Sequence, residues 1–188
     1  LSIRRQRQMC IRDRLGTDFM GLCWVGPAII AHGTDAQKAE HLERILDGES
    51  LWCTGYSEPD VGSDLASLQC RAVRDGDEYV INGQKIWTTS AHVATNIFLL
   101  VRTDPEVAKW RGITCLLVPM DTPGIEVRGI ENLSGKASFN QVFFDDVRTP
   151  VSNRLGAEGE GWRVVMGALA NERLSLIHIS EPTRLRRI

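Results

Sequence analysis

The 188-residue sequence lacks any apolar stretch long enough to cross a bilayer, and no apolar core follows its basic N-terminus as in a secretion signal. It also lacks a CxxC pair. The five cysteines are odd in number and scattered, which argues against both a disulfide framework and a zinc site. The four histidines show no metal-ligand spacing. We therefore expect a cytoplasmic protein with no membrane span and no bound metal.

Composition places the chain among globular proteins. With 43% hydrophobic residues it can bury a core, but 188 residues is short for an enzyme with separate cofactor and catalytic domains. One domain with pieces of others is the expectation. The formal net charge of −2 is unevenly distributed: residues 1–14 carry a net +4 and residues 174–188 a net +2, which leaves −8 on the acidic part between them.

The two basic ends are related through the DNA that can encode them. A DNA stretch that can encode residues 9–13, extended by the next bases, reads on its opposite strand as residues 174–178. The pattern resembles translated adapter sequence from sequencing libraries. We therefore expect residues 1–14 and 174–188 to be non-native tails without a function, not basic arms that bind nucleic acid or membranes. On this interpretation the natural protein continues beyond residue 173.

Hydrophobic periodicity predicts helices before residue 50. Thr34 and Gln37 have the spacing of a capping box, in which each side chain satisfies a backbone amide of the other residue. Apolar residues follow at helical spacing until Gly48, which favours an amphipathic helix. The apolar segment 19–30 upstream also favours a helix.

From residue 51 the pattern changes to short apolar runs separated by turn residues, which predicts strands. Asn82 and Gly83 form the dipeptide most typical of a two-residue hairpin turn, because both turn positions need positive φ. Helical spacing returns from Trp162 onward. The strands are predicted at 68–73, 78–81, 84–87, 96–102, 112–118, 124–130 and 141–147.

This order of elements, without an internal repeat or low-complexity linker, predicts an α+β fold. We expect residues 15–50 to end a helical N-terminal domain. Residues 51–155 are expected to form a central antiparallel β-barrel or sandwich, and residues 156–173 to begin a C-terminal helical domain.

Two segments carry the most informative pattern, SEPDVGSD at residues 57–64 and NGQKIWTTS at residues 82–90. They group hydroxyls, small residues and one large aromatic. Such a set suits a flat polar ring that needs hydrogen bonds at one edge and an apolar cover on one face. Both segments resemble motifs of the acyl-CoA dehydrogenase family, TEPxxGSD and NGxKxWITN. Further short segments match the family in the same order, at residues 139–150, 153–156, 159–162 and 171–173, so the resemblance covers about residues 15–173.

The resemblance implies an FAD-dependent enzyme that desaturates an acyl-CoA thioester between its α and β carbons and passes electrons to an electron-transfer flavoprotein. A hydride leaves the β-carbon for the flavin while a carboxylate removes the α-proton, so charge develops at the flavin N1–C2=O edge and at the thioester oxygen. Donors that are fixed before reaction stabilise such charge. By position, the residues implied to line the flavin are Tyr56, Ser57, Gly62, Ser63, Trp87, Thr88 and Thr89.

The resemblance also implies individual roles. The Ser57 hydroxyl and nearby main-chain N–H groups would bind the N1–C2=O edge, and Gly62 would allow the backbone to approach the ligand closely. Trp87 would cover one ring face, and the two threonines after it would bond near flavin N5. The residues implied to contact the acyl-CoA are Ser63 and Arg173.

No residue is assigned as the catalytic base, which the family places in its C-terminal helical domain or on a neighbouring helix. Glu58 lies within the first motif, but the resemblance implies a structural role for it. Two departures from the family pattern are Asp60, expected to point to solvent, and Tyr56, expected to reshape the acyl entrance. Because the family builds part of its FAD site from C-terminal helices and a neighbouring subunit, we expect the 188 residues alone to bind flavin weakly or not at all and to be inactive.

Two alternatives remain open. The chain could come from a non-catalytic or half-site subunit of a heteromeric complex that holds flavin or acyl-CoA while a partner supplies the base. It could also come from a flavin oxidase or monooxygenase on the same fold. The resemblance further implies a homo- or hetero-oligomer, a dimer or tetramer, with a homotetramer as the first expectation and no nucleic-acid partner.

Overall fold

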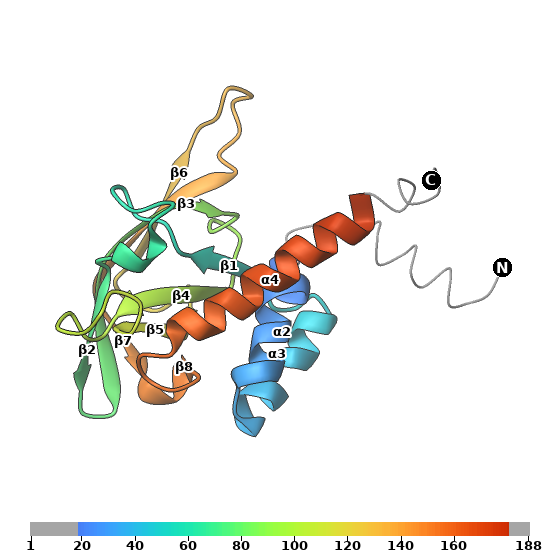
Figure 1. The fold of residues 1–188 in the computed structure, drawn as a ribbon. Coiled ribbons are helices and arrows are strands. Elements are labelled where there is room, and N and C mark those ends of the chain that lie inside the picture. The colour runs from blue at the N-terminus through green and yellow to red at the C-terminus, as the bar shows by residue number, and fades with distance from the viewer. Residues whose placement is uncertain (1–18, 181–188) are drawn as a thin grey trace.

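A computed structural model describes the backbone of residues 19–180 and the side chains of residues 19–170 (Figure 1). The described part is α+β, as predicted, with helices before the sheet and one helix after it. The tail predicted at 1–14 and the side chains of the tail predicted at 174–188 lie outside the described residues. The division into domains after residues 50 and 155 stays a prediction.

The first helical elements form one layer beside the sheet (Figure 1). A π-helical turn, η1 (Gly21–Val25), runs without a break into α2 (Gly26–His32), and Pro27 near the start of α2 has no amide to donate to the preceding turn. The next helix, α3 (Asp35–Leu46), ends near the predicted Gly48. Among the described residues, no helix is both long and apolar enough to cross a membrane.

The capping box predicted at Thr34 is present and also ties α3 to the β-domain. The Thr34 hydroxyl accepts from the Gln37 amide at 3.2 Å, and the Gln37 side-chain carbonyl accepts from the Thr34 amide at 3.0 Å. Gln37 Nε2 then donates to the carbonyl oxygens of Ser152 and Arg154 at 2.8 and 3.0 Å. The same glutamine therefore fixes the start of the helix and its position against the sheet.

An eight-stranded sheet runs in the order β6-β7-β3-β2-β4-β5-β8, and β1 pairs with β4 outside this path. Pairing is antiparallel except where β4 lies beside β1 and β2, which run parallel to it. The order is open, so the alternative of a closed barrel is wrong: β6 and the two-residue β8 are the ends of the path, with no pairing between them. The strands are β1 (Trp52–Gly55), β2 (Arg71–Asp75), β3 (Glu78–Thr89), β4 (Asn96–Arg102), β5 (Ile113–Pro119), β6 (Ile125–Ile130), β7 (Phe139–Pro150) and β8 (Arg154–Leu155), with short 3-10 turns η2 (Leu65–Ser67) and η3 (Val151–Asn153).

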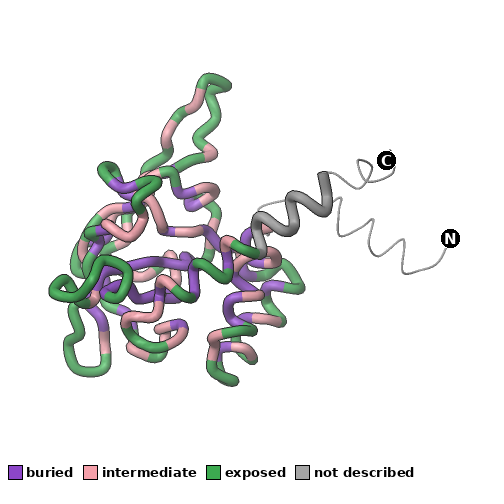
Figure 2. The backbone as a smooth tube through the Cα atoms, viewed as in Figure 1, coloured by how far each residue is buried: buried purple, intermediate pink, exposed green. Residues whose placement is uncertain are grey.

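Strands β4 and β5 separate two hydrophobic cores. Successive side chains of a strand point to opposite faces. Phe98 and Leu100 accordingly join the core under the helices, while Ile97 and Leu99 join the core enclosed by the rest of the sheet. Because both faces are covered, every residue of β4 is buried, which explains the unbroken apolar run at residues 97–101 (Figure 2).

The hairpin turn predicted at Asn82 and Gly83 is wrong. The turn between β2 and β3 is made by Gly76 and Asp77, and β3 continues through Asn82. Gly83 has φ +147°, and a Cβ there would lie 2.8 Å from the Cys70 Cα. The glycine is therefore required by a strand irregularity and a close backbone approach, two causes that produce the same dipeptide as a turn.

Helix α4 (Gly161–Ser180) closes the helical side. It crosses beside β5 and α2 (Figure 1) and buries Val164, Val165 and Ala168 in the core that those elements share. At its first residue, Gly161, a Cβ would lie 2.6 Å from the Thr114 carbonyl carbon, so the helix starts in direct contact with the sheet backbone.

Candidate functional site

The two motif segments lie side by side. The first follows the end of β1, and the second is the latter half of β3. They are joined directly, because the Ile86 amide donates to the Ser57 carbonyl oxygen at 2.9 Å. The structure therefore brings together two segments that are separated by more than a full strand in the sequence.

A bulge in β3 determines which side chains reach the cavity beside these segments. The pairing with β7 shifts register between Lys85 and Thr88, and Trp87 adopts φ +60°. Lys85 and Thr88 are consequently buried within the sheet domain, whereas Ile86, Trp87 and Thr89 line the cavity. The bulge thus re-aims the second motif toward the helical layer.

The cavity has a volume of about 210 Å³ and lies between the motif segments and the helices. Four of the predicted flavin-lining residues surround it: Tyr56, Ser57, Trp87 and Thr89. The remaining lining residues are Met20, Trp24, Thr54, Ile86 and Leu169. Its wall therefore combines hydroxyls from the strand ends with apolar side chains from the helices.

Several polar groups at this cavity are available to a ligand. Within the described residues, neither the amide nor the hydroxyl of Ser57 makes a hydrogen bond. The buried Trp24 Nε1 also has no partner there. Buried donors are normally paired, so unpaired ones beside a cavity favour a ligand with acceptors. Tyr56 is held by an edge-to-face contact with Phe98, with ring centroids 6.0 Å apart.

Gly62 and Ser63 lie apart from this cavity, on an exposed loop between β1 and β2. No atom lies within 4 Å of a Cβ built on Gly62, so the loop leaves space there for an approaching ligand. The loop is anchored by Asp64, whose carboxylate accepts from the Ser67 hydroxyl at 2.5 Å and from Lys109 Nζ at 3.0 Å. These hydrogen bonds lower the pKa of Asp64, and the one from Ser67 has the largest effect.

Glu58 is a structural residue, which agrees with the role implied for it. One carboxylate oxygen accepts from Lys85 Nζ and from the Cys70 amide, each at 2.8 Å, and the other accepts from the Gln69 amide at 2.6 Å. Lys85 is fully buried and also donates to the Tyr56 carbonyl oxygen at 3.1 Å. Glu58 does not line the cavity and both its carboxylate oxygens are engaged, so the structure does not present it as the base. Asp60, in contrast, is exposed, as predicted.

One other predicted residue, Thr88, does not join the cavity. Thr88 is 1% exposed, its hydroxyl has no partner among the described residues, and its carbonyl accepts from Asn140 Nδ2 at 3.0 Å. It therefore lies on the opposite side of the strand from Trp87 and Thr89. The side chain of Arg173, predicted to contact acyl-CoA, lies outside the described residues.

Sequence reasoning missed the helical half of the wall and the role of Lys85. Met20 and Trp24 are four residues apart and so share one face of the first apolar segment, but this spacing does not show that the face meets the motifs. Lys85 occurs where the strand otherwise places apolar side chains inward, which is the pattern of a buried, paired charge. Leu169 had no comparable signal.

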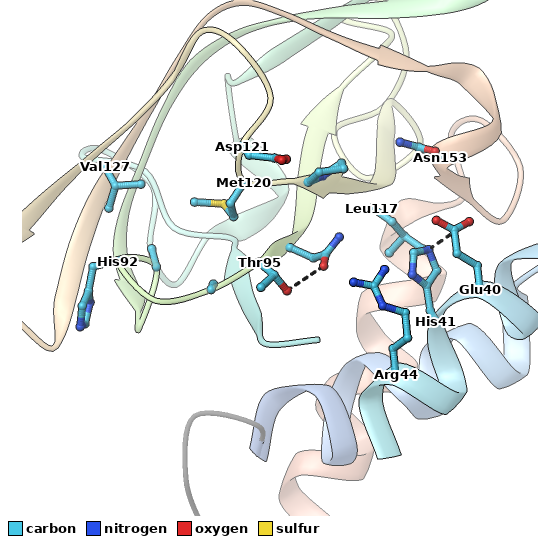
Figure 3. A pocket seen from close by; sticks show the side chains of 14 residues that line it. Glu40, His41, Arg44, His92, Thr95, Leu117, Met120, Asp121, Val127 and Asn153 are labelled. Carbon is cyan, nitrogen blue, oxygen red and sulfur yellow. Dashed lines mark hydrogen bonds and ion pairs between the residues drawn. The ribbon is translucent and has the colours of Figure 1, made fainter. Parts of the chain in front are cut away.

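A larger cavity of about 720 Å³ lies elsewhere, between α3 and the loops at the ends of β4 and β5 (Figure 3). It contains none of the predicted residues. Its polar groups are only partly paired: Asn96 Oδ1 accepts from Ser50 at 3.1 Å and from Thr95 at 2.9 Å, His41 Nε2 lies 4.0 Å from Glu40, and the buried His41 Nδ1 has no partner among the described residues. Among the described residues, no three His, Cys, Asp or Glu side chains converge as a metal site requires. The smaller cavity is therefore the better candidate.

Comparison with known proteins supports the same region. The family profile for the acyl-CoA dehydrogenase middle domain matches residues 53–147. Acyl-CoA dehydrogenase IpdE1 from Mycobacterium tuberculosis is 50% identical over 149 residues, which cover 79% of this chain and 39% of that protein.

Solved structures share the fold, and two of them show how closely. The Tcur3481-Tcur3483 steroid ACAD has a TM-score of 0.81 and 42% identity, over 85% of this chain and 41% of that one. The ChsE4-ChsE5 complex from Mycobacterium tuberculosis has a TM-score of 0.77 and 42% identity, over 84% and 40%. This chain thus spans about 40% of the length of each of these proteins.

Proposed function

Because this chain belongs to the acyl-CoA dehydrogenase family, we propose that it forms the flavin- and thioester-facing wall of an enzyme that desaturates an acyl-CoA between its α and β carbons. Members of the family are oxidoreductases that use FAD. The observation that carries the proposal is the convergence of both motif segments on one cavity, with the amide and hydroxyl of Ser57 unpaired among the described residues.

The residues at the cavity fit one edge and one face of a flavin ring. Ser57 offers an amide and a hydroxyl to ring oxygens, Thr89 offers a second hydroxyl, and Trp87 offers an apolar face. The chemistry that FAD supplies when bound is acceptance of a hydride from the substrate β-carbon. Donors held in place by the backbone stabilise the resulting charge without reorganising. Since a drug-sized ligand needs a pocket of roughly 300–1,000 Å³, a cavity of 210 Å³ corresponds to one wall of such a site.

No Asp or Glu among the described residues lines this cavity, and Glu58 is engaged by Lys85. The proposal therefore assigns no base to the described part. Electron-transfer flavoprotein as the electron acceptor, a cytoplasmic location and the roles of Gly62, Ser63 and Arg173 toward acyl-CoA belong to the same proposal.

A second candidate is a subunit of a complex built from two different chains. It is favoured by the ChsE4-ChsE5 complex and by the paired name of the steroid ACAD, both similar to this chain. A hetero-oligomer therefore has more support than the homotetramer. Steroid-derived thioesters are the acyl substrates to compare first with straight-chain ones, because of the name of that relative.

An exchange protein tests the proposal. In it, residues 53–147 of this chain replace the matching segment of IpdE1, and the unaltered IpdE1 is the control. We expect the purified exchange protein to retain FAD and to lose its flavin absorbance band on anaerobic addition of the acyl-CoA that reduces the control. A folded exchange protein that holds no flavin would contradict the proposed function.

A further inference from the structure

The buried ion pair of Lys85 and Glu58 connects the two halves of the cavity wall, although neither side chain lines the cavity. Glu58 belongs to the first motif and Lys85 to the second, and their charged atoms are 2.8 Å apart. The Lys85 side chain has no exposed surface and that of Glu58 has 7%. A pair of charges buried this deeply is not a gain in stability by default, because both ions lose their hydration.

Lys85 makes a second bond that bears on the cavity directly. Its ammonium group donates to the Tyr56 carbonyl oxygen at 3.1 Å. The peptide bond between Tyr56 and Ser57 is trans, so its C=O and N–H groups point in opposite directions. Holding the carbonyl toward Lys85 therefore directs the Ser57 amide away from Lys85, and Ser57 is a residue that lines the cavity.

The pair also lies where the two strand ends meet. Lys85 immediately precedes the bulge that turns Ile86 and Trp87 toward the cavity, and Ile86 is bonded to the Ser57 carbonyl. On the other side, the Glu58 carboxylate holds the Gln69 and Cys70 amides, which lie just before β2. The ion pair is thus the point at which the first motif, β3 and the start of β2 are fixed to one another.

We propose that Lys85 and Glu58 are a positioning pair: they orient the Ser57 amide and fix the spacing between Ser57 and Trp87, and so determine how the wall receives a flavin ring. The flavin as the ligand rests on the proposed function, whereas the arrangement of Lys85, Glu58 and Ser57 does not. The alternative is a pair that only contributes to folding.

The test uses the 188-residue chain with 5-fluorotryptophan in place of its five tryptophans, and Trp87→Phe to assign the Trp87 resonance. The variants are Glu58→Gln, Lys85→Met and the two combined. Each single variant leaves one unpaired buried charge, whereas the double variant leaves none, so we expect its urea midpoint to recover toward the wild-type value. The Trp87 fluorine resonance should nevertheless stay shifted in the double variant, because Lys85 no longer donates to the Tyr56 carbonyl.

The matched control is the exposed pair of Glu78 and Arg148, 3.0 Å apart. Glu78→Gln combined with Arg148→Met should leave the Trp87 resonance in place. Glu58→Asp, which keeps the charge but shortens the side chain, gives a second reading if the double variant does not fold, and it should also move the resonance. A wild-type Trp87 resonance in either folded variant would overturn the proposal.

The flavin arm uses the exchange protein. With Glu58→Gln and Lys85→Met together, we expect the FAD dissociation constant to rise about tenfold. A change of this size corresponds to the loss of one hydrogen bond to the charged edge of the flavin ring. An unchanged constant would contradict the positioning role. If the exchange protein without these substitutions binds no FAD, the proposed function fails, while the Trp87 resonance still decides whether the pair positions the wall.

Discussion

Trp87 meets Phe139 edge to face, with ring centroids 6.2 Å apart and planes at 78°, yet 58% of Trp87 remains exposed. The same tryptophan has φ +60°, a conformation that costs a non-glycine residue on the order of 1–3 kcal/mol. A strained backbone and an exposed aromatic ring both reduce stability. Their coincidence beside the cavity is explained if the ring contributes to binding.

The strain at Trp87 predicts an unusual order of stability. Trp87→Gly relieves the positive φ and Trp87→Ala does not, so we expect the glycine variant to be the more stable by about 1 kcal/mol in urea unfolding. Glycine is ordinarily the weaker residue within a strand. In the exchange protein both variants should bind FAD less tightly. An alanine variant more stable than the glycine variant would contradict the strain.

The two threonines after Trp87 should respond oppositely to loss of their hydroxyls. Thr88→Val removes a buried hydroxyl that has no partner among the described residues, so the chain should gain about 1 kcal/mol of unfolding free energy, and FAD affinity in the exchange protein should not change. Thr89→Val, the matched control at the cavity, should weaken FAD binding with little effect on stability. Weaker FAD binding by Thr88→Val, with unchanged binding by Thr89→Val, would show that Thr88 and not Thr89 contacts the flavin.

The sequence predicted the order of helices and strands and the two motif segments that form the site. It did not predict which side chains of those segments and of the helices line the cavity. A motif gives the order of residues along the chain but not the direction of each side chain, so the resemblance implied a flavin contact for Thr88. The bulge at Trp87 inverts the alternation of the strand, and Thr88 is buried on its other side. Asn82 and Gly83 matched a turn because positive φ has more than one cause. Trp24 reaches the cavity through helix packing, a contact between distant segments that local periodicity does not encode. Thr34 was predicted correctly because a capping box is local.

Two glycines in the motifs should tolerate alanine very differently. At Gly83 a Cβ would lie 2.8 Å from the Cys70 Cα and φ is +147°, so Gly83→Ala should destabilise the chain by about 2 kcal/mol or more. At Gly62 no atom lies within 4 Å, so Gly62→Ala should change stability by no more than about 0.5 kcal/mol. In the exchange protein, Gly62→Ala should still weaken FAD or acyl-CoA binding. A Gly62→Ala variant with unchanged ligand affinity would remove Gly62 from the site.

His41 predicts a dependence of stability on pH. Burial is the main cause that holds the pKa of His41 below its ordinary value, opposed by Glu40 and reinforced by Arg44. The unfolded chain therefore binds a proton more readily, so unfolding free energy should fall as the pH drops below about 6.5. Urea unfolding at pH about 7 and about 5.5 should show that His41→Phe, which retains a ring against Trp52, loses less unfolding free energy between the two pH values than the wild type does. An equal loss in both proteins would exclude this contribution, and His92→Gln at the surface is the control.

The most direct measurement of the central claim is a crystal structure of the exchange protein with FAD. We expect the flavin ring to contact Ser57, Trp87 and Thr89, with its polar edge toward the Ser57 amide and with Thr88 buried behind the strand. A ring bound away from the cavity between the two motif segments, or one that contacts Thr88 instead of Thr89, would contradict the claim.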